Sequence, residues 1–164
     1  MTESQLASRV LMIRPVRFES NPLTAQSNKF QIRPDASPQQ QQAAALREFE
    51  GLARALEAAG IEVIVVDDTP EPHTPDSIFP NNWISTHNDG RVVLYPMEAE
   101  NRRTERRADI IEYLNTDRGL LVSEVVDLTA HEDAGHYLEG TGSMVLDRVN
   151  RVAYACLSSR THLD

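Results

Sequence analysis

The sequence predicts an α/β protein in which helices alternate with small groups of strands. Two observations lead to this fold class. Short apolar, β-branched runs recur along the chain, and two longer segments carry apolar residues at helical spacing. Their order is roughly β-α-β-β-β-α-β-β-β, whereas a doubly wound sheet would place one strand after each helix. A repeated ββαβ-like unit therefore fits this order better.

The N-terminal part of the chain predicts a strand, a long loop and a helix. Residues 10–13 form a short apolar run that ends at Arg14-Pro15 and is the first strand candidate. Residues 21–38 are polar and contain three prolines, so we expect a long loop, a kind of segment that is often functional. Apolar residues from 45 to 56 then recur at helical spacing, and Ser37-Pro38 and Gly60 supply the start and the stop.

The middle of the chain predicts three strands and a second helix. Residues 61–66 are apolar and β-branched, as in a buried strand. Residues 78–86 form another β-like run, and the turn dipeptide Asp89-Gly90 predicts a hairpin into a strand at 91–95. Residues 101–114 predict a charged helix with one apolar face.

The last part of the chain predicts strands that are separated by turns. A strand is expected at 122–128, short strands flank a glycine-rich turn at 139–143, and a final strand spans 151–157. The glycine-rich segment resembles part of a phosphate loop, but it lacks the following lysine and leads into a strand. A plain tight turn is one alternative. The other is a strand end that aims Glu139 into a site, where the glycines let a ligand approach closely.

Composition excludes several classes of partner and location. The 164 residues are sufficient for one domain with a core, and the net charge of −9 argues against nucleic acid and anionic membrane surfaces. No apolar run reaches membrane-spanning length, and the N-terminus lacks the features of a secretory signal. The single cysteine, Cys156, cannot form an internal disulfide, so we expect a cytoplasmic protein. The histidines lack metal-ligand spacing, and no cofactor is expected.

Residues 75–83 contain the most informative polar cluster. It combines the carboxylate of Asp76, the aromatic ring of Phe79 and the carboxamides of Asn81 and Asn82. Several donors and acceptors with little net charge suit a flat polar ligand such as a guanidinium, a urea or an amide. An ordinary turn is the alternative, because Pro, Asp, Ser and Asn are also the usual turn residues.

Four segments in order resemble the guanidino-group-modifying superfamily, also called penteins, over nearly the whole chain. They are residues 75–82, Arg102-Arg103, residues 138–142 and residues 157–161. The segment 79–83 with Ser-Thr-His behind it is typical of the amidinotransferase-like or citrulline-utilisation hydrolase branch. The family fold is an α/β propeller of five ββαβ units. The resemblance therefore implies a partial α/β propeller, with residues 1–164 as a single incomplete pentein domain, the N-terminal half.

The resemblance also implies roles for individual residues. Asp76 matches the acid that binds guanidine or ureido nitrogens, and Arg102 and Arg160 match positions that hold the substrate carboxylate in bidentate geometry. Glu139 matches the carboxylate that orients a catalytic histidine. Three more residues are assigned to substrate binding: Phe79, Asn81 and Asn82. The alternatives are a turn acid for Asp76, a solvated helix start for Arg102 and a surface charge for Arg160.

Asn82 departs from the family pattern. Related hydrolases and deiminases carry an acid at this position, and the dimethylarginine hydrolases also carry one at the position of Asn81. An amide keeps the hydrogen bonds without the charge, which weakens binding of a buried guanidinium by about 1 kcal/mol or more. We therefore expect an amino-acid ligand of the arginine or citrulline type, with the less cationic citrulline as the leading candidate.

The family reaction also needs a cysteine nucleophile and a base histidine from the second half of the domain. Neither Cys156 nor His162 matches these positions, and Cys156 lies in an apolar run that predicts a buried, inert thiol. We expect part of a hydrolase or amidinotransferase that is inactive alone. The alternatives are a non-catalytic amino-acid-binding module, or an interaction fragment that pairs with itself or with a C-terminal half.

Overall fold

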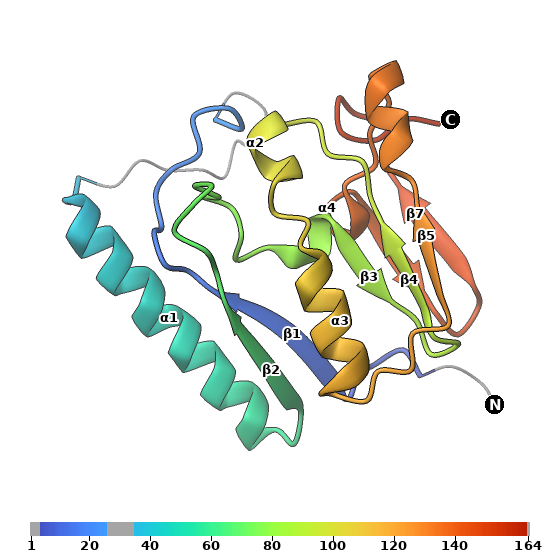
Figure 1. The fold of residues 1–164 in the computed structure, drawn as a ribbon, viewed down its shortest axis with the longest axis horizontal. Helices are drawn as coiled ribbons and strands as arrows, with labels where there is room; N and C mark the ends of the chain where they lie inside the picture. Colours follow the sequence, from blue (N-terminus) through green and yellow to red (C-terminus); the bar gives the residue numbers. More distant parts are fainter. Residues whose placement is uncertain (1–3, 26–34, 164) are drawn as a thin grey trace. The chain divides into compact units, whose positions relative to one another are not determined.

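A computed structural model describes residues 4–25 and 35–163 of the chain (Figure 1). It contains two compact units. Unit 1 comprises residues 1–5 and 81–164, and unit 2 comprises residues 6–80. The order of the longer elements confirms the predicted β-α-β-β-β-α-β-β-β pattern, with short helical turns added between them. The single incomplete domain over residues 1–164 and the partial propeller stay predictions.

Unit 2 is a parallel β-α-β arrangement. Strand β1 (Arg9–Arg14) pairs with β2 (Glu62–Asp67), and helix α1 (Pro38–Ala58) connects them. Phe49 and Ala53 of α1 are buried, as are one isoleucine in each strand. Ser37 caps the helix as predicted: its hydroxyl accepts from Gln40 N, and the Gln40 side chain accepts from Ser37 N. Residues 26–34 of the predicted loop lie outside the described residues.

Unit 1 contains one ββαβ arrangement and one hairpin. Strands β3 (Ile84–Thr86) and β4 (Arg91–Leu94) are antiparallel, and β5 (Glu124–Asp127) pairs parallel with β4 after helices α2 (Glu100–Arg103) and α3 (Ala108–Thr116). Strands β6 (Met144–Asp147) and β7 (Val152–Ala155) form a separate antiparallel pair. The helical turns η2 (Thr129–Ala134) and α4 (Gly140–Ser143) lie between β5 and β6. The core residues of unit 1 include Trp83, Val92, Met97, Ile110 and Leu114.

The predicted strand at 78–86 is wrong in its first half. Residues before it form turns, with Ser77 N donating to Thr74 O and Phe79 N donating to Asp76 O, and η1 (Pro80–Asn82) is a 3-10 helix. Only Ile84–Thr86 is a strand. Proline lacks the N–H that a strand ladder requires, so an extended run cannot pass through Pro80 without losing a hydrogen bond.

Three further expectations are corrected. The helix expected at 101–114 is broken between α2 and α3, because Arg102 and Glu105 turn their charged groups into the unit instead of exposing them on a continuous helix face. The glycine-rich segment 140–143 is a single helical turn rather than a tight turn between strands. Cys156 is exposed rather than buried, because the β7 strand before it is exposed on every residue.

Two searches of the described residues bear on partners. No helix in the described part of the chain is long and apolar enough to span a bilayer. Within residues 4–25 and 35–163, no group of three or more His, Cys, Asp or Glu side chains is placed to hold a metal ion.

Candidate functional site

Glu139 lies at the centre of a buried polar cluster in unit 1. Its side chain is fully buried, with 0% of the residue exposed. The backbone on either side is fixed, because Leu138 forms a β-bridge with Thr161 and Glu139 N donates to Arg160 O at 3.3 Å. Gly140 follows with a φ of 44° and starts helix α4. The carboxylate is thus held at the junction of a bridge and a helical turn.

Three of the predicted site residues converge on this carboxylate. Asn82 Nδ2 and Arg160 Nη1 each lie 3.2 Å from Glu139 Oε2, and Arg102 Nη1 lies 3.8 Å from the same oxygen. Glu98 N donates to Oε1 at 3.2 Å. The donors come from η1, from α2, from the segment after β4 and from the segment after β7. The sequence therefore predicted residues that belong to one cluster.

Arg102 is buried and is held by two carboxylates. Its guanidinium donates to both carboxylate oxygens of Glu105, from Nε and Nη2, each at 3.0 Å. Arg102 is 3% exposed and Glu105 is 4% exposed, so the solvated helix start considered for Arg102 is wrong. With Arg160 and Glu139, the cluster contains two positive and two negative groups. This balance offsets the desolvation cost that buried charges carry.

The glycines after Glu139 allow residues 81–82 to pack closely against helix α4. A Cβ atom at Gly140 would overlap the carbonyl oxygen of Asn81, and one at Gly142 would overlap the side-chain amide of Asn82. Asn82 is thereby packed against α4 while its amide donates to Glu139. The space expected for a ligand beside these glycines is occupied by residues 81–82. Asn81 itself is exposed.

Tyr95 packs beside the same turn. Its ring lies against the Cβ position of Gly140, and its hydroxyl is 2.7 Å from Ser85 Oγ. Burial raises the pKa of the Tyr95 phenol, and the Ser85 hydrogen bond opposes part of this shift.

Asp76 belongs to a second cluster, within unit 2. Its Oδ2 accepts from Asn21 Nδ2 at 2.7 Å and lies 3.4 Å from Thr24 Oγ1, and Asn21 is 1% exposed. The turn considered for this segment is present, since Phe79 N donates to Asp76 O. The Phe79 side chain is 48% exposed. The structure thus holds the Asp76 carboxylate in a defined orientation within a turn.

Sequence reasoning missed the partners of both clusters. Asn21 and Thr24 lie in the polar loop that was expected to be functional, and this was the available signal for them. Glu105 follows Arg102 at a spacing of three, which is a weak signal for an ion pair. No sequence pattern indicated the contacts of Glu132. Its carboxylate accepts from Arg106 at 2.5 and 2.9 Å and from Met97 N at 2.7 Å. These bonds tie η2 to the segment after β4.

The fold and the cluster of a buried glutamate with arginine and asparagine define a member of the guanidino-group-modifying superfamily, as the sequence predicted. The family model "N,N dimethylarginine dimethylhydrolase, eukaryotic" matches residues 14–164. The chain therefore belongs to the N,N dimethylarginine dimethylhydrolase family.

Solved structures of related proteins share the fold. The apo structure of ArgZ, an arginine dihydrolase from the Ornithine-Ammonia Cycle in Cyanobacteria, matches with a TM-score of 0.66 and 20% identity over 94% of this chain and 21% of that chain. The N-terminal domain of ArgZ bound to substrate matches with a TM-score of 0.63 and 21% identity, over 94% of this chain and 51% of that chain. A complex of DDAH from Pseudomonas aeruginosa with citrulline matches with a TM-score of 0.60 and 19% identity, over 94% and 52%.

The chain spans about half of the DDAH chain and of the ArgZ N-terminal domain, and about a fifth of the longer ArgZ chain. At these identities the likeness establishes the fold alone. No curated protein matches the chain.

Proposed function

We propose that this chain is the N-terminal portion of a guanidino- or ureido-modifying enzyme that acts on an arginine- or citrulline-type amino acid. The observation that carries the proposal is the convergence of Asn82, Arg102 and Arg160 on the buried carboxylate of Glu139. A carboxylate with this many donors is held in one orientation, and a residue that positions a catalytic base needs that property.

In the proposed reaction Glu139 positions a histidine, and a cysteine thiol is the nucleophile. The histidine takes the thiol proton, and the thiolate attacks the central carbon of the guanidine or ureido group. The carbon–nitrogen bond breaks as the amine leaves with a proton from the imidazolium. Water then attacks the same carbon, the carbon–sulfur bond breaks, and the thiol is restored. In this proposal the histidine and the cysteine lie outside residues 1–164, and Glu139 is the contribution of this chain.

The two predicted carboxylate-binding arginines differ in how well they suit that role. Arg102 is 3% exposed and is bound in bidentate geometry by Glu105, so it is a fixed element of the cluster. The Arg160 side chain is 28% exposed and donates a single hydrogen bond to Glu139. Arg160 can therefore turn toward a substrate carboxylate. That movement would free one acceptor position on Glu139 Oε2, beside the bond from Asn82, for a donor from the catalytic histidine.

The contact between Asn82 and Glu139 gives a physical reason for an amide where related enzymes carry an acid. The Asn82 amide donates to Glu139 Oε2, and an acid at this position would place a second carboxylate against the first. Like charges at that distance disfavour ionisation of both groups. The amide thus donates a hydrogen bond to Glu139 and adds no negative charge beside it. We propose that, among the described residues, Asp76 is the carboxylate that meets the substrate nitrogens, and a single carboxylate suits the neutral ureido group of citrulline.

Calorimetry on the 164-residue chain with citrulline, arginine and glycine tests the proposal. We expect citrulline to bind more tightly than arginine, and glycine not to bind. Asp76→Asn removes a charged acceptor, so citrulline affinity should fall by about tenfold or more. The matched control is Asp133→Asn, at an exposed aspartate of η2. A strong preference for arginine would contradict the citrulline assignment. Equal losses of citrulline affinity in both variants would contradict the role of Asp76. Turnover of substrate by this chain alone would contradict the assignment of the nucleophile to another segment.

A second candidate function is protein interaction through the β6–β7 hairpin. Val145, Tyr154 and Leu157 are 66%, 60% and 65% exposed, which is unusual for large apolar residues that occur together. Such a surface fits an interface with a second copy or with the other half of a pentein domain. Light scattering over a range of concentrations distinguishes a self-associating chain from a monomer.

A further inference from the structure

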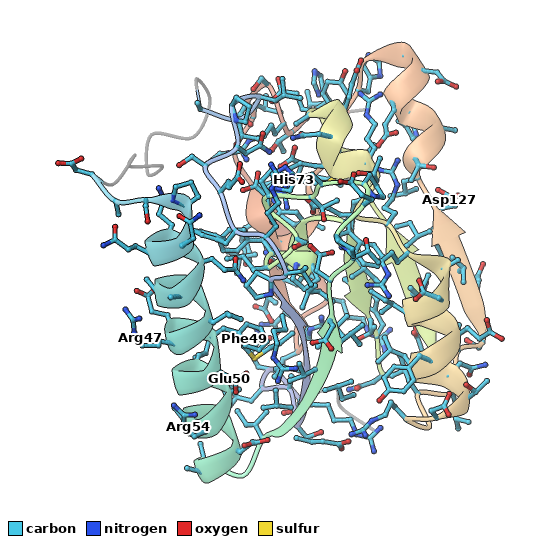
Figure 2. All side chains as sticks on the ribbon, turned by 60° about the vertical axis from the view of Figure 1, so that its left-hand side comes forward. Arg47, Phe49, Glu50, Arg54, His73 and Asp127 are labelled. Carbon is cyan, nitrogen blue, oxygen red and sulfur yellow. The ribbon has the colours of Figure 1, made fainter. Side chains whose placement is uncertain are left out.

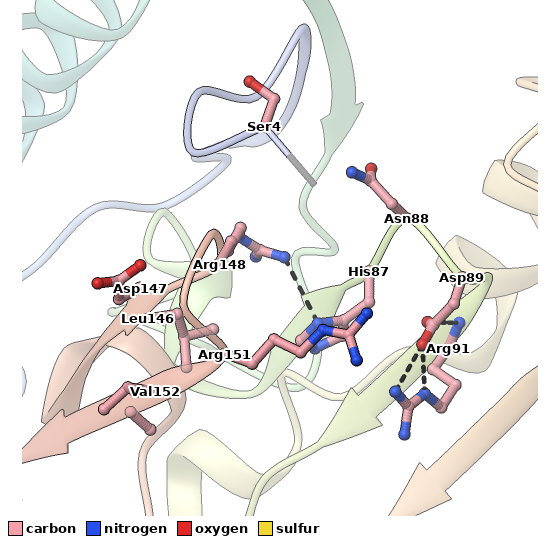
Figure 3. A pocket seen from close by; sticks show the side chains of 11 residues that line it. Ser4, His87, Asn88, Asp89, Arg91, Leu146, Asp147, Arg148, Arg151 and Val152 are labelled. Carbon is pink, nitrogen blue, oxygen red and sulfur yellow. Dashed lines mark hydrogen bonds and ion pairs between the residues drawn. The ribbon is translucent and has the colours of Figure 1, made fainter. Parts of the chain in front are cut away.

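Unit 1 contains a cavity of about 820 Å³ (Figure 3). None of the residues that line this cavity belongs to the Glu139 cluster. One wall is the β6–β7 hairpin, with Arg148 and Arg151, and another is the β3–β4 turn, with His87 and Arg91. We propose that this cavity binds a small organic phosphate monoester through Arg148 and Arg151. The proposal does not depend on the proposed hydrolase function.

The side chain of Arg151 gives the strongest indication that the cavity binds an anionic ligand. Within the described part of the chain, its side chain has no hydrogen bond or ion pair, and it lines the cavity. Its φ is 56°, and Arg151 is the only described residue other than glycine with a positive φ. Glycine or asparagine adopts this conformation at lower cost, so an arginine here is not explained by the turn. An anion in the cavity would give its guanidinium a partner.

The two acids at the cavity are engaged elsewhere. Asp89 accepts from the Nε and Nη2 atoms of Arg91, at 2.8 and 2.5 Å. Asp147 accepts from the backbone and the side-chain amide of Asn150, at 2.9 and 2.8 Å, and Figure 3 shows its carboxylate pointing away from His87. Neither carboxylate neutralises Arg151. Arg91, Arg148 and Arg151 face two aspartates in the cavity lining, so the lining carries a net charge of +1 although the whole chain carries a net charge of −9.

A chain of hydrogen bonds fixes the second basic group. Arg148 Nη1 donates to Thr86 O at 3.2 Å and lies 3.4 Å from His87 Nδ1. His87 Nε2 is 2.9 Å from Ser85 Oγ, which in turn is 2.7 Å from the buried Tyr95 hydroxyl. The guanidinium of Arg148 is thus held across the cavity against the β3–β4 turn. Two guanidinium groups offer many N–H donors, which suit a phosphoryl group with its three terminal oxygens better than a carboxylate with two.

The hairpin wall is tied down by a residue from the start of the chain. Gln5 Nε2 donates to Leu146 O at 2.9 Å, and Gln5 Oε1 accepts from Arg148 N at 2.8 Å. Both ends of one amide thereby hold the end of β6 and the start of the turn that carries Arg148. Leu146, Val152 and Ala153 add an apolar lining, which suits an organic group attached to the phosphate.

The test compares phenyl phosphate, inorganic phosphate and phenol as probes of the 164-residue chain. Binding is followed at low ionic strength by calorimetry and by amide shifts in a nitrogen-15 NMR spectrum. Arg151→Asn removes the charge and keeps a residue that tolerates positive φ. The matched control is Arg54→Ala, which removes the same charge from an exposed position on α1 in unit 2, labelled in Figure 2.

We expect phenyl phosphate to bind more tightly than inorganic phosphate, and phenol not to bind. Arg151→Asn should weaken phenyl phosphate binding by about tenfold, because it removes a charged hydrogen-bond donor, and Arg54→Ala by less than about twofold. The shifts should concentrate at residues 85–91 and 146–153. Equal weakening by both variants, binding of phenol as tight as that of phenyl phosphate, or shifts centred outside these residues would overturn the proposal. Citrulline affinity serves as a separate readout that Arg151→Asn should leave unchanged.

Discussion

Two regions of unit 1 reverse the usual relation between polarity and burial. The cluster around Glu139 places four charged groups in or near the interior, with Glu139 and Arg102 at 0% and 3% exposure. The β6–β7 hairpin leaves Val145 and Tyr154 at 66% and 60% exposure. Charged residues are therefore buried in one region, while large apolar residues face outward in the other.

The difference lies in what each region has available to contact. Every charge in the Glu139 cluster meets a partner from the same unit, and the cluster is neutral when its two arginines and two glutamates are counted. The hairpin is a sheet of only two strands, and such a sheet buries little of its own apolar surface. In this unit, burial follows the supply of partners rather than the polarity of the side chain.

The largest expected effect comes from removing the centre of the buried cluster. Glu139→Ala leaves Arg102 with one carboxylate instead of two and removes the carboxylate to which Arg160 donates. Breaking a buried ion pair in this way costs about 3–5 kcal/mol of unfolding free energy. Urea unfolding followed by the fluorescence of Trp83 measures it, because this sole tryptophan is 1% exposed in unit 1.

The matched control for that variant is Glu124→Ala, at an exposed glutamate of β5 in the same unit. A surface substitution of this kind should change the unfolding free energy by less than about 0.5 kcal/mol. If the two variants lose the same free energy, the Glu139 cluster contributes no more than a surface charge, and the comparison between the two regions is broken.

The next effect contrasts one substitution at two glycines. Gly140→Ala places a Cβ on the Asn81 carbonyl at a φ of 44°, and we expect a loss of about 2 kcal/mol or more by the same fluorescence measurement. Gly51→Ala lies in α1 with nothing within 4 Å of the new atom. It should stabilise the helix by about 0.5–1 kcal/mol, as followed by circular dichroism. Losses of equal size at both positions would show that close approach of residues 81–82 is not what requires Gly140.

The sequence predicted the order of elements better than their boundaries. Helix α1 was predictable because its capping box and Gly60 are local signals. The break after α2 was not, because it depends on Arg102 and Glu105 finding a buried site that is completed by Glu139. Local periodicity carries no information about such a partner, so 101–114 read as one helix.

The same limit applies to the candidate site. Resemblance to a family identified Asp76, Arg102, Glu139 and Arg160, but it could not predict which of them touch. The bond from Asn82 to Glu139 spans 57 positions, and the bond from Arg160 spans 21. The Asn82 contact follows from the packing of residues 81–82 against α4, which the glycines of α4 make possible. Their roles toward a substrate stay predictions.

A smaller effect on stability is expected at the hairpin. The double variant Val145→Thr with Tyr154→Thr alters a cross-strand pair of β6 and β7 and places β-branched residues, which favour strands, at both positions. Because both side chains are exposed, the unfolding free energy should change by less than about 1 kcal/mol. Self-association, measured by light scattering at several concentrations, should decrease. A loss as large as that of Glu139→Ala would show that the hairpin is as tightly packed as the buried cluster.

The smallest effect concerns the exposed ion pair of Arg91 and Asp89. Like the buried pair of Arg102 and Glu105, it is joined by bonds from Nε and Nη2 of the arginine. Asp89 is held by the Arg91 guanidinium and by Arg91 N, and these bonds lower the pKa of Asp89 from 3.8 to about 2. A depressed carboxyl pKa means that the contribution to stability is present above the unfolded pKa, near 3.9, and is lost as the pH falls through about 2. Because solvent and salt screen an exposed pair, that contribution is small.

NMR titration of the Asp89 carboxyl carbon separates the two kinds of ion pair. We expect a midpoint near 2 in the unaltered chain and a higher midpoint in Arg91→Gln, still below the ordinary value of about 3.9 because the bond from the backbone N–H of residue 91 remains. High salt should move the unaltered midpoint in the same direction, while Arg91→Gln should leave the urea midpoint at neutral pH nearly unchanged. A midpoint that stays near 2 in Arg91→Gln would assign the shift to the turn backbone. A large loss of stability would mean that an exposed pair in this unit contributes as much as a buried one.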